Sequence, residues 1–161
     1  GLLQDRRGPE GEELPAGHRW SINADIATHS VVMDATSRTL WVSRYPNTEG
    51  GYVSYQLDAV LAGAIEPVEV IPPGEIQRTL SIHQGRRLLG RGGSAAEREE
   101  QARHALLLMP EHPQALLALG EALVAQGQCV EAQAPLQGAL ATPPEYRRHV
   151  DEIHNLLEEC K

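Results

Sequence analysis

Residues 113–144 read PQALLALGEALVAQGQCVEAQAPLQGALATPP, and this stretch decides the fold of the second half of the chain. Small and apolar side chains recur at helical spacing in two segments, which predicts two amphipathic helices. Gly127 lies between them, where a tight turn favours a residue that tolerates positive φ. Pro143 and Pro144 end the second helix because proline supplies no amide donor. The residues expected to pack the two helices together are Leu116, Leu119, Gly120, Leu123, Ala132, Leu136 and Ala139.

This helix pair resembles the tetratricopeptide repeat, whose period is about 34 residues. Gly120 is expected to face Ala132, since short side chains let antiparallel helices approach closely. One period earlier and one period later the pattern matches in part, so we expect half repeats on either side of one good repeat. The predicted helices cover residues 95–109, 113–126, 129–141 and 144–159.

A change in composition along the 161 residues indicates two modules of different class. Every tryptophan and tyrosine except Tyr146 lies within the first 55 residues, whereas the tail is rich in Ala, Leu and Glu. Between them, prolines, glycines and the basic residues Arg86, Arg87 and Arg91 favour a flexible linker. The predicted division is a first module at 1–63, a linker at 64–92 and a helical module at 93–161.

The first module has the pattern of a small β-structure. Residues 25–33 alternate as a strand does, 34–38 are rich in turn formers, and 39–43 form a second strand, which together predict a β-hairpin. Residues 52–57 read as a further extended piece before a helical turn at 58–62. Both faces of the first strand are mostly apolar, so we expect covering layers from polypeptide upstream. A short strand near 68–71 and a short helix at 76–89 are also expected.

The runs ATHSVVMD (27–34) and TLWVS (39–43), with the loop at Pro46 and Asn47, carry a family resemblance. Together with LQDRRG (3–8) and Asn23, they resemble the C-terminal portion of C45-type autoproteolytic acyltransferases, N-terminal nucleophile hydrolases that include isopenicillin N acyltransferase. The resemblance covers roughly residues 1–62. It implies an αββα sandwich that this β-hairpin would complete, so the expected fold class is α+β with an all-α, tetratricopeptide-like tail.

The same resemblance implies amide hydrolysis or acyl transfer by a cysteine that self-cleavage leaves at a chain start. The α-amine at a chain start has a pKa of about 8, so it can act as the base for the adjacent thiol. Gly1 is no nucleophile, and Cys129 and Cys160 lie far from the module concerned. We therefore expect the nucleophile outside this chain, which would be inactive alone, with the remainder of a longer parent enzyme as its partner.

Four residues of the first module are candidates to line the site of the complete enzyme. Thr28, His29 or Ser30 would face the space between the layers, and Asn23 would donate to an oxyanion. The alternative is that these side chains bond to neighbouring backbone and that Asn23 caps a turn. His29 and Ser30 do not form a base–nucleophile pair, because consecutive strand residues point to opposite faces.

Cys129 and Cys160 match neither a disulfide-rich scaffold nor a zinc motif. The repeat pattern brings the start of one helix near the end of the next, so a bridge between them is one interpretation. The interpretation we favour from the sequence is two free, half-buried thiols, which needs no oxidising compartment.

Net charge and hydropathy limit the classes of molecule that the chain is expected to bind. A formal net charge of −8 disfavours binding to nucleic-acid phosphates or anionic lipid. No stretch is long and apolar enough to span a bilayer, and the seven histidines have no ligand spacing, so neither metal nor cofactor is expected. The alternative function is a protein-interaction module built on the repeat. In a third interpretation the tail only stabilises the sandwich.

Overall fold

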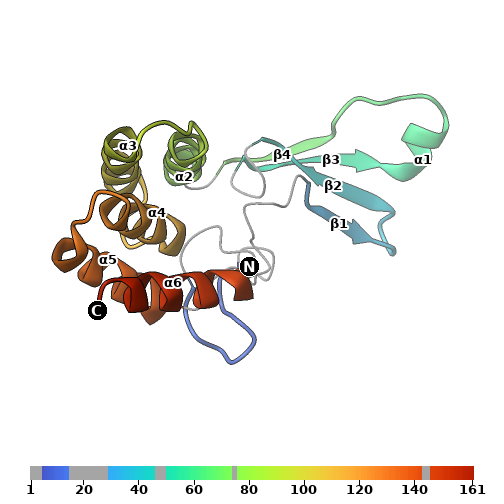
Figure 1. The fold of residues 1–161 in the computed structure, drawn as a ribbon. Helices are drawn as coiled ribbons and strands as arrows, with labels where there is room; N and C mark the ends of the chain where they lie inside the picture. The colour runs from blue at the N-terminus through green and yellow to red at the C-terminus, as the bar shows by residue number, and fades with distance from the viewer. Residues whose placement is uncertain (1–4, 15–28, 46–49, 74–75, 143–145) are drawn as a thin grey trace. The chain divides into compact units, whose positions relative to one another are not determined.

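The structure, a computed structural model, describes residues 5–14, 29–45, 50–73, 76–142 and 146–161. The chain forms two compact units, Gly1–Gly11 with Ala16–Leu80, and Glu12–Pro15 with Ser81–Lys161. The first unit holds a four-stranded antiparallel sheet and the second most of the helices (Figure 1), so the coarse α+β class is confirmed. Residues 81–92, which the sequence assigned to a linker, belong to the second unit.

The sheet is an antiparallel meander of strands that follow one another in the chain. Its strands are β1 (Val31–Asp34), β2 (Thr39–Ser43), β3 (Tyr52–Gln56) and β4 (Glu69–Ile71). Trp41 of β2 lies opposite Val32 of β1 on one side and Ser54 of β3 on the other. The short helix α1 (Leu57–Leu61) follows β3 directly. The predicted hairpin, third strand, helical turn and short strand near 68–71 are confirmed.

The turn between β1 and β2 forms because its residues satisfy their own backbone. The Asp34 carboxylate accepts hydrogen bonds from the amides of Thr36 (2.8 Å) and Ser37 (3.3 Å) and from the Ser37 hydroxyl (2.7 Å). Arg38 completes the reversal with a φ of 51°. The hydroxyl of Ser37, followed by the two amides, lowers the pKa of Asp34. Residues 34–38 therefore carry the turn that the sequence predicts.

The first strand is shorter than predicted. Residues 25–28 lie outside the described residues, His29 and Ser30 are not in a strand, and β1 begins only at Val31. At this point the Ser30 amide donates to the Ser43 hydroxyl (2.8 Å) rather than to a backbone carbonyl. The apolar residues Val31, Val32 and Met33 are 47%, 41% and 78% exposed within this chain, and the covering layers expected from upstream polypeptide stay a prediction. The αββα sandwich stays a prediction.

Five further helices follow the sheet. They are α2 (Ile76–Leu89), α3 (Ala95–Leu108), α4 (Pro113–Val124), α5 (Cys129–Ala141) and α6 (Arg147–Glu159). The helices predicted at 76–89, 95–109, 113–126 and 129–141 are confirmed within about two residues at their ends. Gly127 has a φ of 73°, as the turn requires. The predicted stop at Pro143 and Pro144 lies outside the described residues, and α6 begins three residues after the predicted 144.

Helix α4 forms the centre of the second unit. It begins with Pro113 at its first turn, where no intrahelical amide bond is lost, and it packs against α3, α5 and α6. Ser94 begins α3 with a reciprocal capping box, in which its hydroxyl and amide exchange hydrogen bonds with Glu97. The buried cluster consists of Ala102, Leu117, Leu119, Leu123, Val124, Ala132, Leu136, Ala139 and Ile153.

Candidate functional site

A groove on the second unit is the strongest candidate site in the described residues. It has a cavity of about 440 Å³ between side chains of α2, α4 and α6. On α4 the lining residues recur at positions i, i+3, i+4 and i+7, which places them on one face of the helix. The residues that line the groove, and so define it, are Arg86, Leu89, Gly90, Gln114, Leu117, Ala118, Glu121, His149 and Glu152.

Two carboxyl groups meet in the groove, Glu121 from α4 and Glu152 from α6. Burial raises the pKa of Glu121 to about 7, and the hydrogen bond to Glu152 and the charge of that group contribute to the rise. The positive charge of Arg98 acts in the opposite direction. Glu121 therefore retains its proton to a higher pH than an exposed glutamate does.

Arg86 joins the groove to the start of α4. One of its terminal nitrogens lies 3.4 Å from Nε2 of His112, a ring that is only 2% exposed. The His112 carbonyl accepts hydrogen bonds from the amides of Ala115 (3.0 Å) and Leu116 (3.1 Å), so the histidine also begins the helix. Arg86 belongs to α2 and not to a flexible linker, which corrects the interpretation from the sequence.

The residues predicted to pack the helix pair lie together in the buried cluster of the second unit. Leu119, Gly120, Leu123, Ala132, Leu136 and Ala139 are buried, and Leu116 is half-buried against the same cluster. The nearest side chain to Gly120 is that of Leu136, whereas we expected Ala132 to face this glycine. A Cβ built at Gly120 would meet Cδ2 and Cγ of Leu136, and no atom of Ala132 is among its nearest contacts. The larger leucine fills the space that the glycine leaves.

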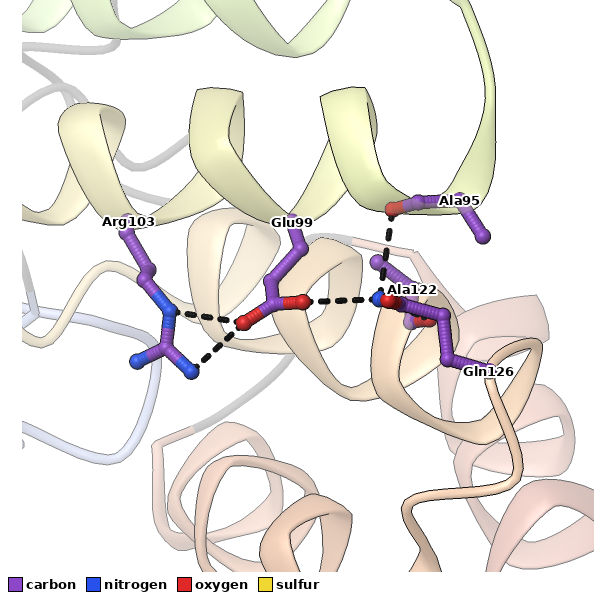
Figure 2. Close-up of polar contacts among 5 residues, drawn as sticks. All are labelled: Ala95, Glu99, Arg103, Ala122 and Gln126. Carbon is purple, nitrogen blue, oxygen red and sulfur yellow. Dashed lines mark hydrogen bonds and ion pairs between the residues drawn. The ribbon is translucent and has the colours of Figure 1, made fainter.

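A polar network fixes α3 against the C-terminal end of α4 (Figure 2). The Gln126 side-chain amide donates to Glu99 (2.7 Å) and to the carbonyl of Ala122 (3.1 Å). Arg103 donates to the other oxygen of Glu99 at 2.7 and 3.0 Å. The hydrogen bond from Gln126, followed by that from Arg103, lowers the pKa of Glu99. These residues position the helices and do not line the groove.

A disulfide between Cys129 and Cys160 links the start of α5 to the end of α6. Their Cα atoms lie 5.2 Å apart. The favoured interpretation of two free thiols is therefore wrong, and the bridge is present. It forms because antiparallel packing of α5 and α6 brings the two helix ends together, a long-range result that cysteine count alone does not reveal.

The four candidate residues of the first module are only partly described. Asn23 and Thr28 lie outside the described residues, and His29 is exposed. The Ser30 hydroxyl accepts a hydrogen bond from the Tyr52 hydroxyl (3.0 Å), and the Ser30 carbonyl accepts one from the Ser43 amide (2.9 Å). Hydrogen bonds to residues of β2 and β3 thus hold Ser30 in place, and its role in a larger enzyme stays a prediction.

The groove residues were missed at the sequence level. Glu121, His149 and Glu152 are polar residues on amphipathic helices, and such residues usually face water. The available signal was their spacing, since Glu121 lies one helical turn after Leu117, and His149 and Glu152 are three residues apart. That α4 and α6 would bring these polar faces together depends on helix packing, which the sequence pattern does not give.

The described residues contain no group of three or more His, Cys, Asp or Glu side chains arranged to hold a metal ion. Within the same residues, no helix has the length and apolar character needed to cross a membrane. The chain matches no protein-family model, no curated protein and no solved structure.

Proposed function

We propose that the helical unit is a protein-interaction module of the tetratricopeptide type, which binds an extended peptide segment of a partner protein in the groove. The observation that carries this proposal is the cavity of about 440 Å³ bounded by three helices. Its size is in the usual range for ligand pockets, about 300–1,000 Å³, and it combines apolar side chains with a few ionisable ones. Stacked helix pairs use such surfaces for binding.

The carboxyl groups of Glu121 and Glu152, rather than Arg86 of the same groove, favour a basic side chain in the bound segment. Leu89, Leu117 and Ala118 supply apolar surface for the methylene groups of a lysine or arginine. Its charged end would lie between Glu121 and Glu152 and replace the proton that the raised pKa of Glu121 retains. Binding should therefore release a proton near neutral pH. Calorimetry in two buffers of different ionisation enthalpy measures that release, and a heat independent of buffer would contradict the basic preference.

Selection from a random-peptide phage library on the full chain tests the binding function. The Ala118→Trp variant fills the groove with an indole, whereas Ala134→Trp makes the same change at an exposed position of α5 outside the groove. We expect selected peptides to bind wild type and Ala134→Trp alike and to lose at least tenfold in affinity for Ala118→Trp. Equal binding to both variants, or no selected peptide, would refute the proposal.

A second candidate function concerns the first unit, and the exposed β1 favours it. Val31, Val32 and Met33 present apolar surface of the kind that an additional layer covers. On the family resemblance we propose that this sheet completes an acyltransferase or amidohydrolase of the C45 type. Cys129 and Cys160 are bonded to each other, so another polypeptide would have to supply the nucleophilic cysteine.

The sequence upstream of Gly1 in the parent gene tests this second candidate. It should encode a cysteine-led strand, and mass spectrometry of the expressed parent should find that cysteine at a new chain start. The purified parent should then hydrolyse a chromogenic acyl-anilide. An upstream sequence without a cysteine at the start of a strand would count decisively against the acyltransferase.

A further inference from the structure

Helix α6 forms one wall of the groove, and few of its described side chains are fully buried. Ile153, 1% exposed, is the one residue of α6 that is fully buried among those described. Leu156, Leu157 and Cys160 add partly buried contacts to the cluster. An isolated helix of 13 residues is marginal in water. The position of α6 therefore depends strongly on what holds its ends.

The disulfide holds the C-terminal end of α6. Cys160 follows the helix directly and is bonded to Cys129, the first residue of α5, so the bond closes the α5–α6 pair at the end opposite its connecting loop. The two groove residues of α6, His149 and Glu152, lie on the helix that this bond secures. Figure 1 shows α5 and α6 as neighbouring helices near the C-terminus.

We propose that the Cys129–Cys160 disulfide is a redox-sensitive crosslink whose reduction releases α6 and removes one wall of the groove. The claim that reduction regulates binding rests on the proposed function of the groove. The claim that reduction releases α6 depends only on the geometry of the helices. Binding would then be confined to oxidising conditions, and a reducing compartment would leave the groove open on one side.

The redox step uses a dithiol reductant. A thiolate of the reductant attacks one sulfur of the bridge, which breaks the Cys129–Cys160 bond and gives a mixed disulfide. The second thiol of the reductant then displaces the protein sulfur and leaves in a cyclic disulfide. In total two electrons and two protons pass to the protein, which gains two thiols. Neither cysteine is fully buried, so solvent reaches the residues that react.

The release should be local because the remaining helices pack without α6. Gly120 of α4 lies directly against Leu136 of α5, and Ala102 of α3 is completely buried in the same cluster. The network of Gln126, Glu99 and Arg103 holds α3 to α4 and involves no residue of α6. Helices α3, α4 and α5 should therefore stay folded when α6 detaches.

Hydrogen–deuterium exchange of the full chain, followed by mass spectrometry, tests the crosslink without any ligand. With dithiothreitol, we expect the amides of α6 to exchange roughly several hundred-fold faster, as loss of a crosslink of this loop length predicts, while α3 and α4 exchange more slowly than α6 and remain protected. The double variant Cys129→Ser with Cys160→Ser should exchange in the same way without reductant and should not respond to it. Unchanged protection of α6 would overturn the inference, and so would loss of protection in every helix.

The same samples separate the two proposals. A library-selected peptide that binds the oxidised chain and loses affinity on reduction, together with faster exchange in α6, supports both. Faster exchange in α6 with no peptide bound by the oxidised chain supports the crosslink and refutes the binding function. A peptide that binds oxidised and reduced chain equally, with α6 still protected, supports the binding function and refutes the crosslink.

Discussion

Gly120 is a position in the helical unit that tolerates little change. A Cβ there would overlap Cδ2 and Cγ of Leu136, a side chain that is fully buried in the core. Replacing glycine inside a helix with alanine normally stabilises by up to about 1 kcal/mol. At this position the steric overlap exceeds that gain, because overpacking a closed core costs about 1–3 kcal/mol.

We therefore expect Gly120→Ala to lower the free energy of unfolding by about 1–2 kcal/mol, measured by urea denaturation. Gly138→Ala on α5 is the matched control. Its Cβ would approach the half-buried Leu116 at 3.2 Å, and this flexible side chain can move. The control should be neutral or slightly stabilising. Equal effects at the two glycines would show that close packing of Gly120 on Leu136 is not a constraint.

The second prediction at this scale concerns Glu121, whose pKa is raised from 4.5 to about 7. A carboxyl group with a raised pKa binds its proton more tightly in the folded state, so the free energy of unfolding falls as pH rises from 4.5 to about 7. Glu121→Gln removes this dependence. Because the side chain is partly exposed, we expect the variant to gain only about 1–2 kcal/mol over wild type at about pH 8.

Near about pH 4.5 the two proteins should have similar stability, since the wild-type carboxyl group is then largely protonated in the folded state. Urea denaturation at both pH values checks the difference. The control Glu131→Gln changes a glutamate of α5 outside the groove and should show no such pH dependence. A Glu121→Gln variant that is no more stable than wild type at about pH 8 would contradict the raised pKa of Glu121 in the folded state.

Among the elements, α3 offers a clear test of local sequence rules. The Ser94 hydroxyl accepts a hydrogen bond from the Glu97 amide (3.3 Å), while the Ser94 amide donates to the Glu97 carboxylate (2.8 Å). Ser94→Ala should lower the free energy of unfolding by about 1 kcal/mol. Ser94→Asp restores an acceptor at the cap and should recover most of the loss. An alanine variant as stable as wild type would show that packing alone fixes this helix start.

The predictability of the elements follows from how local their signals are. The helix pair at α4 and α5 was predicted because its leucines, small residues and Gly127 all lie within one continuous stretch. The turn at 34–38 was equally readable, since Asp34 bonds to amides two and three residues ahead. The length of β1 could not be read from the sequence, because the hydroxyl of Ser43 in the paired strand accepts the hydrogen bond from the Ser30 amide. The groove was not predicted and the disulfide was not favoured, because both depend on how α6 packs.

For the molecule as a whole, the disulfide has the largest single effect that we expect on stability. It joins residues separated by 31 positions, and restricting an unfolded loop of that length stabilises the fold by about 3–4 kcal/mol. The Cys129→Ser and Cys160→Ser double variant should lose an amount of this order in urea denaturation without reductant. A loss below about 1 kcal/mol would show that packing holds α6 without the crosslink.

The two units carry separate proposals. The sheet unit is tied to a family resemblance that rests on the sequence, whereas the groove is defined by the geometry of one unit alone. The bound peptide is therefore the most direct route to function. The peptide should contact α2, α4 and α6, which the sequence pattern did not predict to form a common site.

Nuclear magnetic resonance of the isotopically labelled full chain, titrated with a library-selected peptide under oxidising conditions, tests the central claim most directly. We predict that the largest amide shifts fall on the groove residues Gln114, Ala118 and Glu121 of α4 and His149 and Glu152 of α6. Small shifts should accompany them in α5, which lines no part of the groove. Shifts confined to the sheet unit or to the exposed face of α5 would contradict the binding function.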